Sequence, residues 1–240
     1  MLCCIECGKE TKSLTTKYSN YIQVSKCKYC KKKVDKYLEF NNTVLLIDLI
    51  LLKKNAFRHI IYNSTYRTKK TLYFYIFFTT IKILFNLKKR IGKLIPFNCD
   101  MNNTLFTGYN KTLINKHWFI CNYKSILKSI FDIIIESLLY KGFTILFLIA
   151  TLYVQNNIKK DIFRRLINTI VFSSFYHIFL LFTLVWNYSY DEYYFIVEFL
   201  VFIANSTALS ILAGKKIYYF YFALFLFKTL SKTITRIIIQ

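Results

Sequence analysis

Two cysteine pairs near the N-terminus organise this chain: Cys4-Ile-Glu-Cys7 and Cys27-Lys-Tyr-Cys30. Nineteen residues separate the pairs, so the pattern is C-x2-C-x19-C-x2-C, a spacing typical of a zinc site. Zn2+ prefers a tetrahedron of soft or borderline ligands, and each C-x-x-C turn offers two thiolates from one tight knuckle. Gly8 follows the first pair, where the backbone has to turn sharply. The pattern predicts a small ribbon that holds one structural Zn2+ and leaves no open position for a substrate.

The cysteine pattern leaves alternatives open. Cys3 could replace Cys4 in a looser C-x3-C pair. The four cysteines of the motif could also form two disulfides, or be unrelated thiols in a cysteine-rich segment. Cys99 and Cys121 have no paired neighbour, and the sequence assigns them no role.

The rest of the chain has the composition of a membrane protein. Of its 240 residues, 55% are hydrophobic, and Phe (24) and Tyr (20) together number 44. A bilayer core is about 30 Å thick, which a helix of about 20 apolar residues can cross. Four apolar runs are candidates: Leu138–Val154, Leu166–Trp186, Tyr193–Ala213 and Ile217–Leu230. Thr71–Leu87 is a weaker fifth, because Lys82 lies inside it. We predict a multi-spanning α-helical membrane protein with a small N-terminal zinc-ribbon module.

Charges in the links between these runs suggest an orientation. The links 155–165 and 214–216 hold four and two bases, whereas 187–192 holds two acids, so the first two are expected in the cytosol. A cytosolic N-terminal module then requires 71–87 to span the membrane as well. Alternatively, 71–87 lies in the interface, or 126–154 forms a re-entrant pair. The polar N-terminus shows no signal peptide, so insertion through an internal segment is expected.

Residues 41–66 are predicted to form one amphipathic helix in the membrane interface. The apolar run 44–52 has nine residues, too few to span a bilayer. Polar residues at positions 48, 55, 59 and 63 would share one face of such a helix. We hypothesise that four of its residues contact a lipid headgroup or a partner: Asp48, Arg58, His59 and Asn63. The alternative is the ordinary solvated face of an amphipathic helix.

Three further motifs follow the second cysteine pair in order. They are Asp35-Lys36-Tyr37-Leu38-Glu39, Ile47-Asp48-Leu49-Ile50-Leu51, and Arg58-His59 followed by Asn63. With the cysteine pairs, this order resembles the Arv family of endoplasmic-reticulum lipid-homeostasis proteins. The resemblance covers residues 1–63, about a quarter of the chain, and departs from the family pattern at Asn41, where an acid is usual. It implies a role in sterol trafficking, sphingolipid balance and glycosylphosphatidylinositol-anchor synthesis, and leaves open whether the protein moves lipid directly.

The basic charge of the chain favours a membrane partner. The net charge is +22, and residues 1–70 hold 15 bases against five acids. Near anionic headgroups each such base contributes ~1 kcal/mol. Nucleic acid, the usual alternative for a basic zinc ribbon, is not expected here, because the ribbon directly precedes membrane segments.

The sequence shows no catalytic signature. H-E-x-x-H, G-x-S-x-G and the phosphate-binding G-x-x-x-x-G-K-[ST] are all missing, so we expect a protein that is not an enzyme. Glu198 and His177 lie inside the two best apolar runs, where charged groups are costly. They could line a polar path for a sterol hydroxyl or a lipid headgroup. Alternatively, they lie near span ends, or pair with Lys141 and Lys128.

These observations divide the chain into four parts. We expect a zinc ribbon over 1–40, the interfacial helix over 41–66, a candidate membrane segment with a basic loop over 67–137, and transmembrane helices over 138–240. The resemblance then implies a non-enzymatic mediator of sterol and lipid homeostasis in the endoplasmic-reticulum membrane, extending to the Golgi. Expected partners are sterol, anionic lipids, glycosylphosphatidylinositol precursors and lipid-synthesis enzymes. The alternative is a zinc-ribbon scaffold that recruits such an enzyme.

Overall fold

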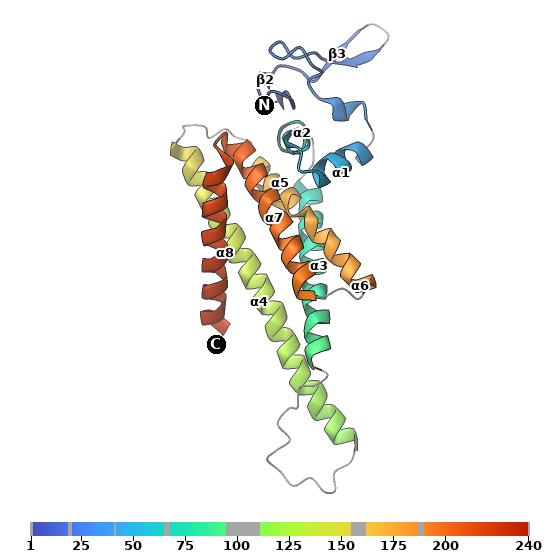
Figure 1. Ribbon diagram of the computed structural model, residues 1–240, viewed down its shortest axis with the longest axis vertical. Coiled ribbons are helices and arrows are strands. Elements are labelled where there is room, and N and C mark those ends of the chain that lie inside the picture. Colours follow the sequence, from blue (N-terminus) through green and yellow to red (C-terminus); the bar gives the residue numbers. More distant parts are fainter. Residues whose placement is uncertain are drawn as a thin grey trace.

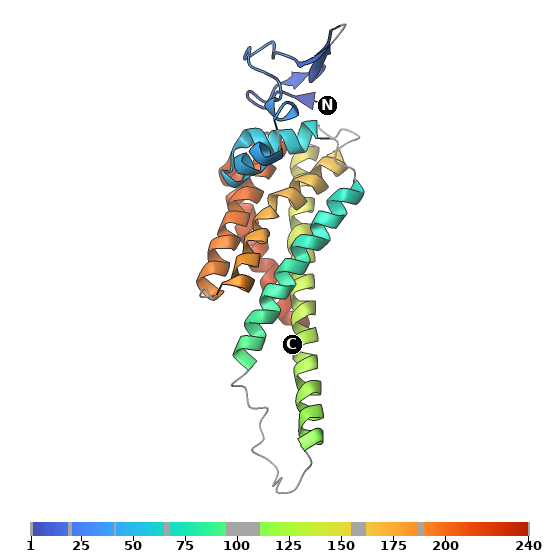
Figure 2. The same ribbon diagram turned by 90° about the vertical axis from the view of Figure 1, so that its right-hand side faces the viewer.

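A small ribbon at one end of a bundle of long helices makes up the computed structural model (Figures 1 and 2). The structure describes residues 2–18, 21–40, 42–64, 68–94, 111–154, 162–186 and 190–239. Cys99 lies outside the described residues, and so does the side chain of Cys121.

The ribbon consists of two short antiparallel strand pairs. β1 (Leu2–Cys3) pairs with β2 (Glu10–Thr11), and β3 (Thr15–Lys17) pairs with β4 (Ile22–Val24). The first pair flanks the first cysteine knuckle, and a bridge between Lys26 and Lys33 flanks the second. β4 leads into the second knuckle.

Residues 36–63 form several short helices instead of the predicted single helix over 41–66. They are the 3-10 helix η1 (Lys36–Leu38), α1 (Asn42–Ile50), α2 (Lys54–Arg58) and the π-helix η2 (His59–Asn63). The break follows α1, where Leu52 takes a left-handed conformation (φ 55°). Its N–H donates to the Leu49 carbonyl, and the N–H of Lys53 donates to the Asp48 carbonyl, as in a Schellman helix end. Such an end usually carries glycine, so the leucine gave no stop signal.

The bundle contains the long helices and one bent segment. They are α3 (Thr68–Leu94), α4 (Lys111–Val154), α5 (Ile162–Ser173), the 3-10 helix η3 (Phe175–Leu181), α6 (Phe182–Val185), α7 (Tyr190–Ala213) and α8 (Ile217–Ile239). α4 packs along α8, and α7 packs against both α5 and α8. One apolar core runs through the bundle and reaches the ribbon, because Ile5 and Phe57 belong to it. Gly214 (φ 65°) allows the sharp turn between α7 and α8.

Among the described residues, two helices are long and apolar enough to cross a membrane: Ile130–Val154 and Asp191–Ala213. Thr71–Leu87 is a shorter apolar helix. The re-entrant pair considered for 126–154 is not formed, because α4 is one continuous helix there. The other two predicted runs, 166–186 and 217–230, do not form helices that are both long and apolar enough to cross a membrane. In α8, Lys228, Lys232 and Arg236 interrupt the apolar surface.

The run 166–186 is not one straight helix, as a simple span would require. It changes from α-helix to 3-10 helix at Ser174. The Ser173 and Ser174 hydroxyls both donate to the carbonyl of Ile170, a kind of bond that bends helices. Downstream of the change, Tyr176 donates its hydroxyl to the carbonyls of Leu49 and Ile50 at the end of α1. The bent segment therefore joins the bundle to the helices beneath the ribbon.

Candidate functional site

The four predicted cysteines form one cluster. The sulfur atoms of Cys4, Cys7, Cys27 and Cys30 all lie within 4.8 Å of one another, and the Cys4–Cys30 and Cys7–Cys27 pairs are 3.7 Å apart. A tetrahedral metal with bonds of about 2.3 Å to sulfur requires sulfur–sulfur distances of roughly 3.8 Å. None of these cysteines is in a disulfide, so that alternative is not formed. The cluster can hold a metal ion.

The two knuckles have the same backbone geometry. In the first, the N–H of Gly8 donates to the Cys4 carbonyl (2.8 Å), and in the second Lys31 donates to Cys27 (3.0 Å). Gly8 and Lys31 both have positive φ, 77° and 62°. A left-handed residue therefore closes each knuckle, although only the first uses glycine.

Cys3 is separate from the cluster. Its backbone is paired with Asn63, and burial raises the pKa of its thiol to about 12. The four-sulfur group contains Cys4 and not Cys3, which decides between the two patterns considered from the sequence.

α2 forms hydrogen bonds to the first knuckle through Arg58 and Asn55. Arg58 donates from Nη1 to the carbonyls of Ile5 (2.8 Å) and Glu6 (2.5 Å). Its guanidinium lies close enough to Gly8 that an added Cβ would be 3.3 Å from Cζ. Asn55 donates to the Glu6 carboxylate at 3.0 Å. The carbonyls of Ile5 and Glu6 in the knuckle are thus satisfied by α2.

A buried polar network lies next to this contact. Asn63 forms a two-way amide pair with the backbone of Cys3, at 3.0 and 2.9 Å, and donates to the Asp35 carboxylate at 2.7 Å. The same Asp35 oxygen is 2.7 Å from Nδ1 of His59. The other Asp35 oxygen accepts from the N–H of Tyr37. Asp35 is fully buried, so these bonds compensate for the loss of its hydration.

Asp48 is the centre of a second network. Its carboxylate accepts from the Tyr37 hydroxyl (2.8 Å) and from the ammonium groups of Lys36 (2.8 Å) and Lys53 (2.7 Å). Burial opposes its charge, but the hydrogen bonds from the two lysines and Tyr37 outweigh burial and hold the pKa of Asp48 well below its usual range. Burial and the bond to Asp48 raise the pKa of Tyr37.

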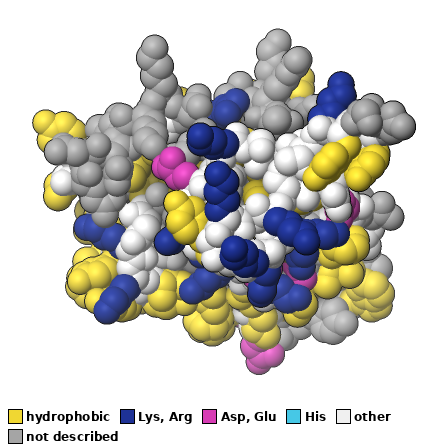
Figure 3. Space-filling model, turned by 90° about the horizontal axis from the view of Figure 1, so that it is seen from above, with side chains coloured by type: hydrophobic (Ala, Val, Ile, Leu, Met, Phe, Trp, Pro, Cys, Tyr) yellow, Lys and Arg dark blue, Asp and Glu magenta, His cyan; other side chains and the backbone are white. Residues whose placement is uncertain are grey.

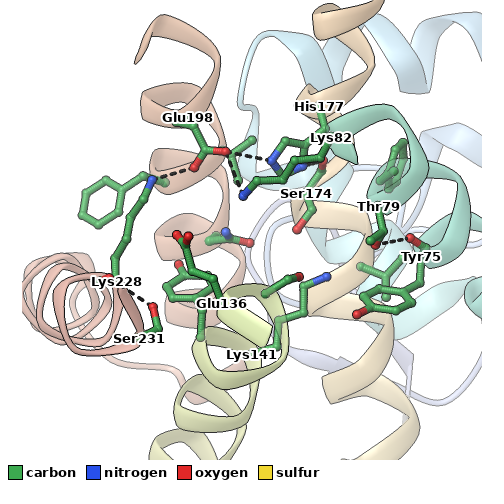
Figure 4. A pocket seen from close by; sticks show the side chains of 17 residues that line it. Tyr75, Thr79, Lys82, Glu136, Lys141, Ser174, His177, Glu198, Lys228 and Ser231 are labelled. Atoms are coloured by element: carbon green, nitrogen blue, oxygen red, sulfur yellow. Dashed lines mark hydrogen bonds and ion pairs between the residues drawn. The ribbon is translucent and has the colours of Figure 1, made fainter. Parts of the chain in front are cut away.

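A different polar cluster lies inside the bundle, in a cavity between α3, α4, η3, α7 and α8 (Figure 4). Glu198 is its centre, 2.6 Å from Lys228 and 3.2 Å from both Lys82 and His177. These residues come from four different elements, so the cluster exists only in the folded bundle. Glu198 is paired, as one alternative predicted, but its lysine partners are Lys82 and Lys228 and not Lys141 or Lys128. Both Glu198 and His177 also line the cavity.

Comparison with known families places the chain. The model of the Arv1-like family matches residues 3–209, which include both the ribbon and most of the bundle. The chain belongs to the Arv1-like family. The resemblance stated from the sequence is thereby confirmed. Together with the apolar helices, membership indicates a membrane protein.

Relatives in other organisms are similar mostly over one segment. The chain is 50% identical to Protein ARV1 of Saccharomyces cerevisiae over 62 residues, which is 25% of this chain and 19% of that protein. It is 44% identical to Protein ARV1 of Homo sapiens over 62 residues, 25% of this chain and 23% of that one. Protein arv1 of Schizosaccharomyces pombe is 26% identical over 96% of this chain and 82% of its own length. The matches to the Saccharomyces cerevisiae and Homo sapiens proteins thus cover about a fifth of the length of each of those relatives. No solved structure matches.

In this member of the Arv1-like family, the four residues predicted to contact lipid all contact protein. Asp48, His59 and Asn63 are buried, and Arg58 bonds to the ribbon backbone. Their lipid contact stays a prediction, since the observed bonds join the ribbon to the helices. Sequence reasoning did not assign a role to Asp35, although it opens the D-K-Y motif directly after the second knuckle.

Proposed function

We propose that this protein maintains sterol and lipid distribution in the endoplasmic-reticulum membrane without catalysing a reaction. Membership of the Arv1-like family supports a role in sterol and lipid homeostasis. Intracellular sterol transport, support of sphingolipid and glycosylphosphatidylinositol-anchor synthesis, and a further location in the Golgi are the finer parts of the proposal. The absence of a catalytic motif from the sequence is consistent with a non-enzymatic role.

In this proposal the metal is one structural Zn2+. Four thiolates at tetrahedral spacing are a closed, soft ligand set of the kind that structural zinc sites use. In the described part of the ribbon, the apolar cluster around the site consists of Cys4, Cys27 and Val34, with Leu14 and Cys30 at its edge. So small a core gives the ribbon little stability of its own, and metal binding can supply what it lacks.

The ribbon end is proposed to lie at the cytosolic surface of a multi-spanning protein. Among residues 2–40, eight lysines are exposed, against two exposed acids, Glu10 and Glu39. Figure 3 shows Lys and Arg side chains spread over this end of the molecule. α1 carries an apolar exposed surface just below it: Leu46, Ile47 and Ile50, continued by Leu51. Bases above an apolar helix surface suit an interface with anionic headgroups.

One observation supports the ribbon and the helices below it acting as a single ribbon unit, residues 2–63. The family motifs of residues 35–63 supply the groups that tie the two together, through Asp35, Arg58 and Asn63. η2 is in turn tied to the bundle, because Tyr62 donates to the carbonyl of Ile211 on α7. We infer that the unit fixes the ribbon relative to the membrane and presents it to sterol, anionic lipid or glycosylphosphatidylinositol precursors.

Complementation tests this proposal. Cells that lack their own family member would express the full chain with Asn63→Ala, which removes the amide pair to Cys3, or with Lys12→Ala, which changes only an exposed lysine. We expect the Lys12 variant to restore normal sterol distribution and the Asn63 variant to leave sterol in the endoplasmic reticulum at equal protein level. Full restoration by Asn63→Ala would contradict a role for the ribbon unit.

A scaffold that recruits a lipid-synthesis enzyme is the second candidate. The ribbon exposes Tyr18, Tyr21 and Tyr29, with exposed fractions of 49%, 60% and 62%. Exposed aromatic residues are enriched where proteins bind one another. Purification from membranes would separate the two candidates: a lipid-synthesis enzyme that copurifies with the chain and is lost in Tyr21→Ala and Tyr29→Ala supports the scaffold. Labelled sterol that binds the purified chain alone supports direct handling of lipid.

A further inference from the structure

The cavity in the bundle has the size of a polar headgroup. Its volume is about 50 Å3. Pockets that enclose a whole small molecule have volumes of roughly 300–1,000 Å3, and one water needs about 10–15 Å3. The cavity therefore has room for a few waters or the polar end of a lipid, and not for an entire sterol or lipid.

The cavity lies at the depth of the hydrocarbon if α7 spans the membrane. α7 runs from Tyr190 to Ala213, 24 residues, or about 36 Å at 1.5 Å per residue. Glu198 is about 12 Å from its first residue and about 22 Å from its last. Charged groups at this depth are costly unless they are paired or bind a charged ligand.

Two further charged side chains, beyond the Glu198 cluster, line the cavity. Glu198 is compensated by Lys82, Lys228 and His177, as described above. Glu136 and Lys141 also point into the cavity, from α4 (Figure 4). Among the residues that the structure describes, neither the Glu136 carboxylate nor the Lys141 ammonium forms a hydrogen bond or a close ion pair, although the charge of Glu136 acts on Lys82 at longer range. Lys141 instead lies over the ring of Tyr75, with Nζ 3.9 Å from the centroid.

These unpaired charges have opposite signs, which restricts the ligand. A simple anion would pair with Lys141 and leave Glu136 unpaired, and a simple cation would do the reverse. A sterol hydroxyl would neutralise neither. Around the cavity, three lysines (Lys82, Lys141 and Lys228) face two glutamates (Glu136 and Glu198), so one positive charge is in excess. The ligand therefore needs an ammonium group and a group at least as strongly anionic.

We propose that this cavity binds the headgroup of a phospholipid that carries both a phosphate and a primary ammonium group. The phosphate pairs with Lys141, the ammonium pairs with Glu136, and the acyl chains remain in the bilayer. The site goes beyond the proposed function: it lies in the bundle, apart from the ribbon unit, and does not depend on which lipid the protein redistributes.

Lipid retention measured by native mass spectrometry tests the site. The full-length chain would be delipidated in detergent and mixed with phosphatidylcholine vesicles containing a minor fraction of either phosphatidylethanolamine or phosphatidylglycerol. The variants are Glu136→Gln, Lys141→Gln and, as a matched control, Lys128→Gln, an exposed residue of α4 outside the cavity. Soluble phosphoethanolamine serves as a competitor, and size-exclusion profiles check folding.

We expect phosphatidylethanolamine to be retained above the other two lipids. Each cavity variant should weaken retention about tenfold, because each removes a charge-assisted bond, and the control should not. Equal retention of all three lipids by every variant would overturn the proposal. Retention of phosphatidylglycerol that is lost only in Lys141→Gln would overturn the ammonium contact. Equally strong binding of soluble phosphoethanolamine would show that the occupant is not a lipid.

Discussion

The ribbon and the helical bundle satisfy their buried polar groups in different ways. In the ribbon unit, Asp35 and Asp48 are surrounded by partners from residues 36–63, including residues of the three motifs that follow the cysteines. In the bundle, Glu198 draws its partners from α3, η3 and α8, and Glu136 and Lys141 pair with no described residue. In the ribbon unit the buried carboxylates have their hydrogen bonds satisfied by protein, as in a structural contact. In the bundle, Glu136 and Lys141 have no such bonds and are available to bind a ligand.

The largest expected effect concerns the four-cysteine cluster, where the proposed Zn2+ would stabilise the ribbon and not the bundle. In the full-length chain, Cys27→Ser should abolish zinc binding and unfold the ribbon, since metal binding supplies about 10–16 kcal/mol to such modules. Elemental analysis would measure zinc, and limited proteolysis would show which part opens. Cys3→Ser is the control, because Cys3 lies outside the four-sulfur cluster, and it should keep about one zinc per chain. A ribbon that resists protease after chelation would contradict this view.

The next effect concerns the bundle. Glu198→Gln would leave Lys82 and Lys228 without their shared acid, and we expect it to destabilise the protein by about 3 kcal/mol. Thermal unfolding in detergent would measure the loss. Glu39→Gln removes the exposed ion pair with Lys33 and should cost less than about 1 kcal/mol. Equal stability of the two variants would show that water, and not protein, compensates the charges in the bundle.

A smaller effect separates Asp48 from the rest of the ribbon unit through pH. Its pKa is lower in the folded state than the ordinary value of 3.8, so its stabilising contribution is complete above that value and is lost as the pH falls below it. Asp48→Asn should therefore destabilise the contact between ribbon and helices at neutral pH. The difference from the unmodified protein should shrink below about pH 4. Amide hydrogen exchange of α1, measured across this range, would detect it, and a difference independent of pH would refute the charge-based explanation.

The smallest effect compares the two knuckles. Gly8→Ala should cost about 1 kcal/mol, because φ is 77° and the new Cβ would press on the Arg58 guanidinium. Lys31→Gly, at the equivalent left-handed position, should instead stabilise the ribbon by about 0.5 kcal/mol. Chelator competition, which reads ribbon stability as zinc affinity, would measure both. Effects of the same sign would mean that the knuckles are not equivalent.

The sequence by itself determined what depends on local spacing. Two C-x2-C pairs predicted the four-cysteine cluster, and apolar runs predicted long apolar helices after the ribbon. The ordered motifs also identified the family. Each of these is set by neighbours along the chain, which periodicity and spacing record directly.

Only the tertiary structure decided where the polar residues face. Helical periodicity placed Asp48, His59 and Asn63 on one face, but the left-handed turn at Leu52 breaks that helix, and the ribbon covers the polar residues. The bend at Ser174 and the partners of Glu198 were equally hidden, since they depend on helices distant in sequence. A buried charge has to be compensated by a partner, and that partner can come from an element that is distant in sequence. Sequence spacing does not record such contacts.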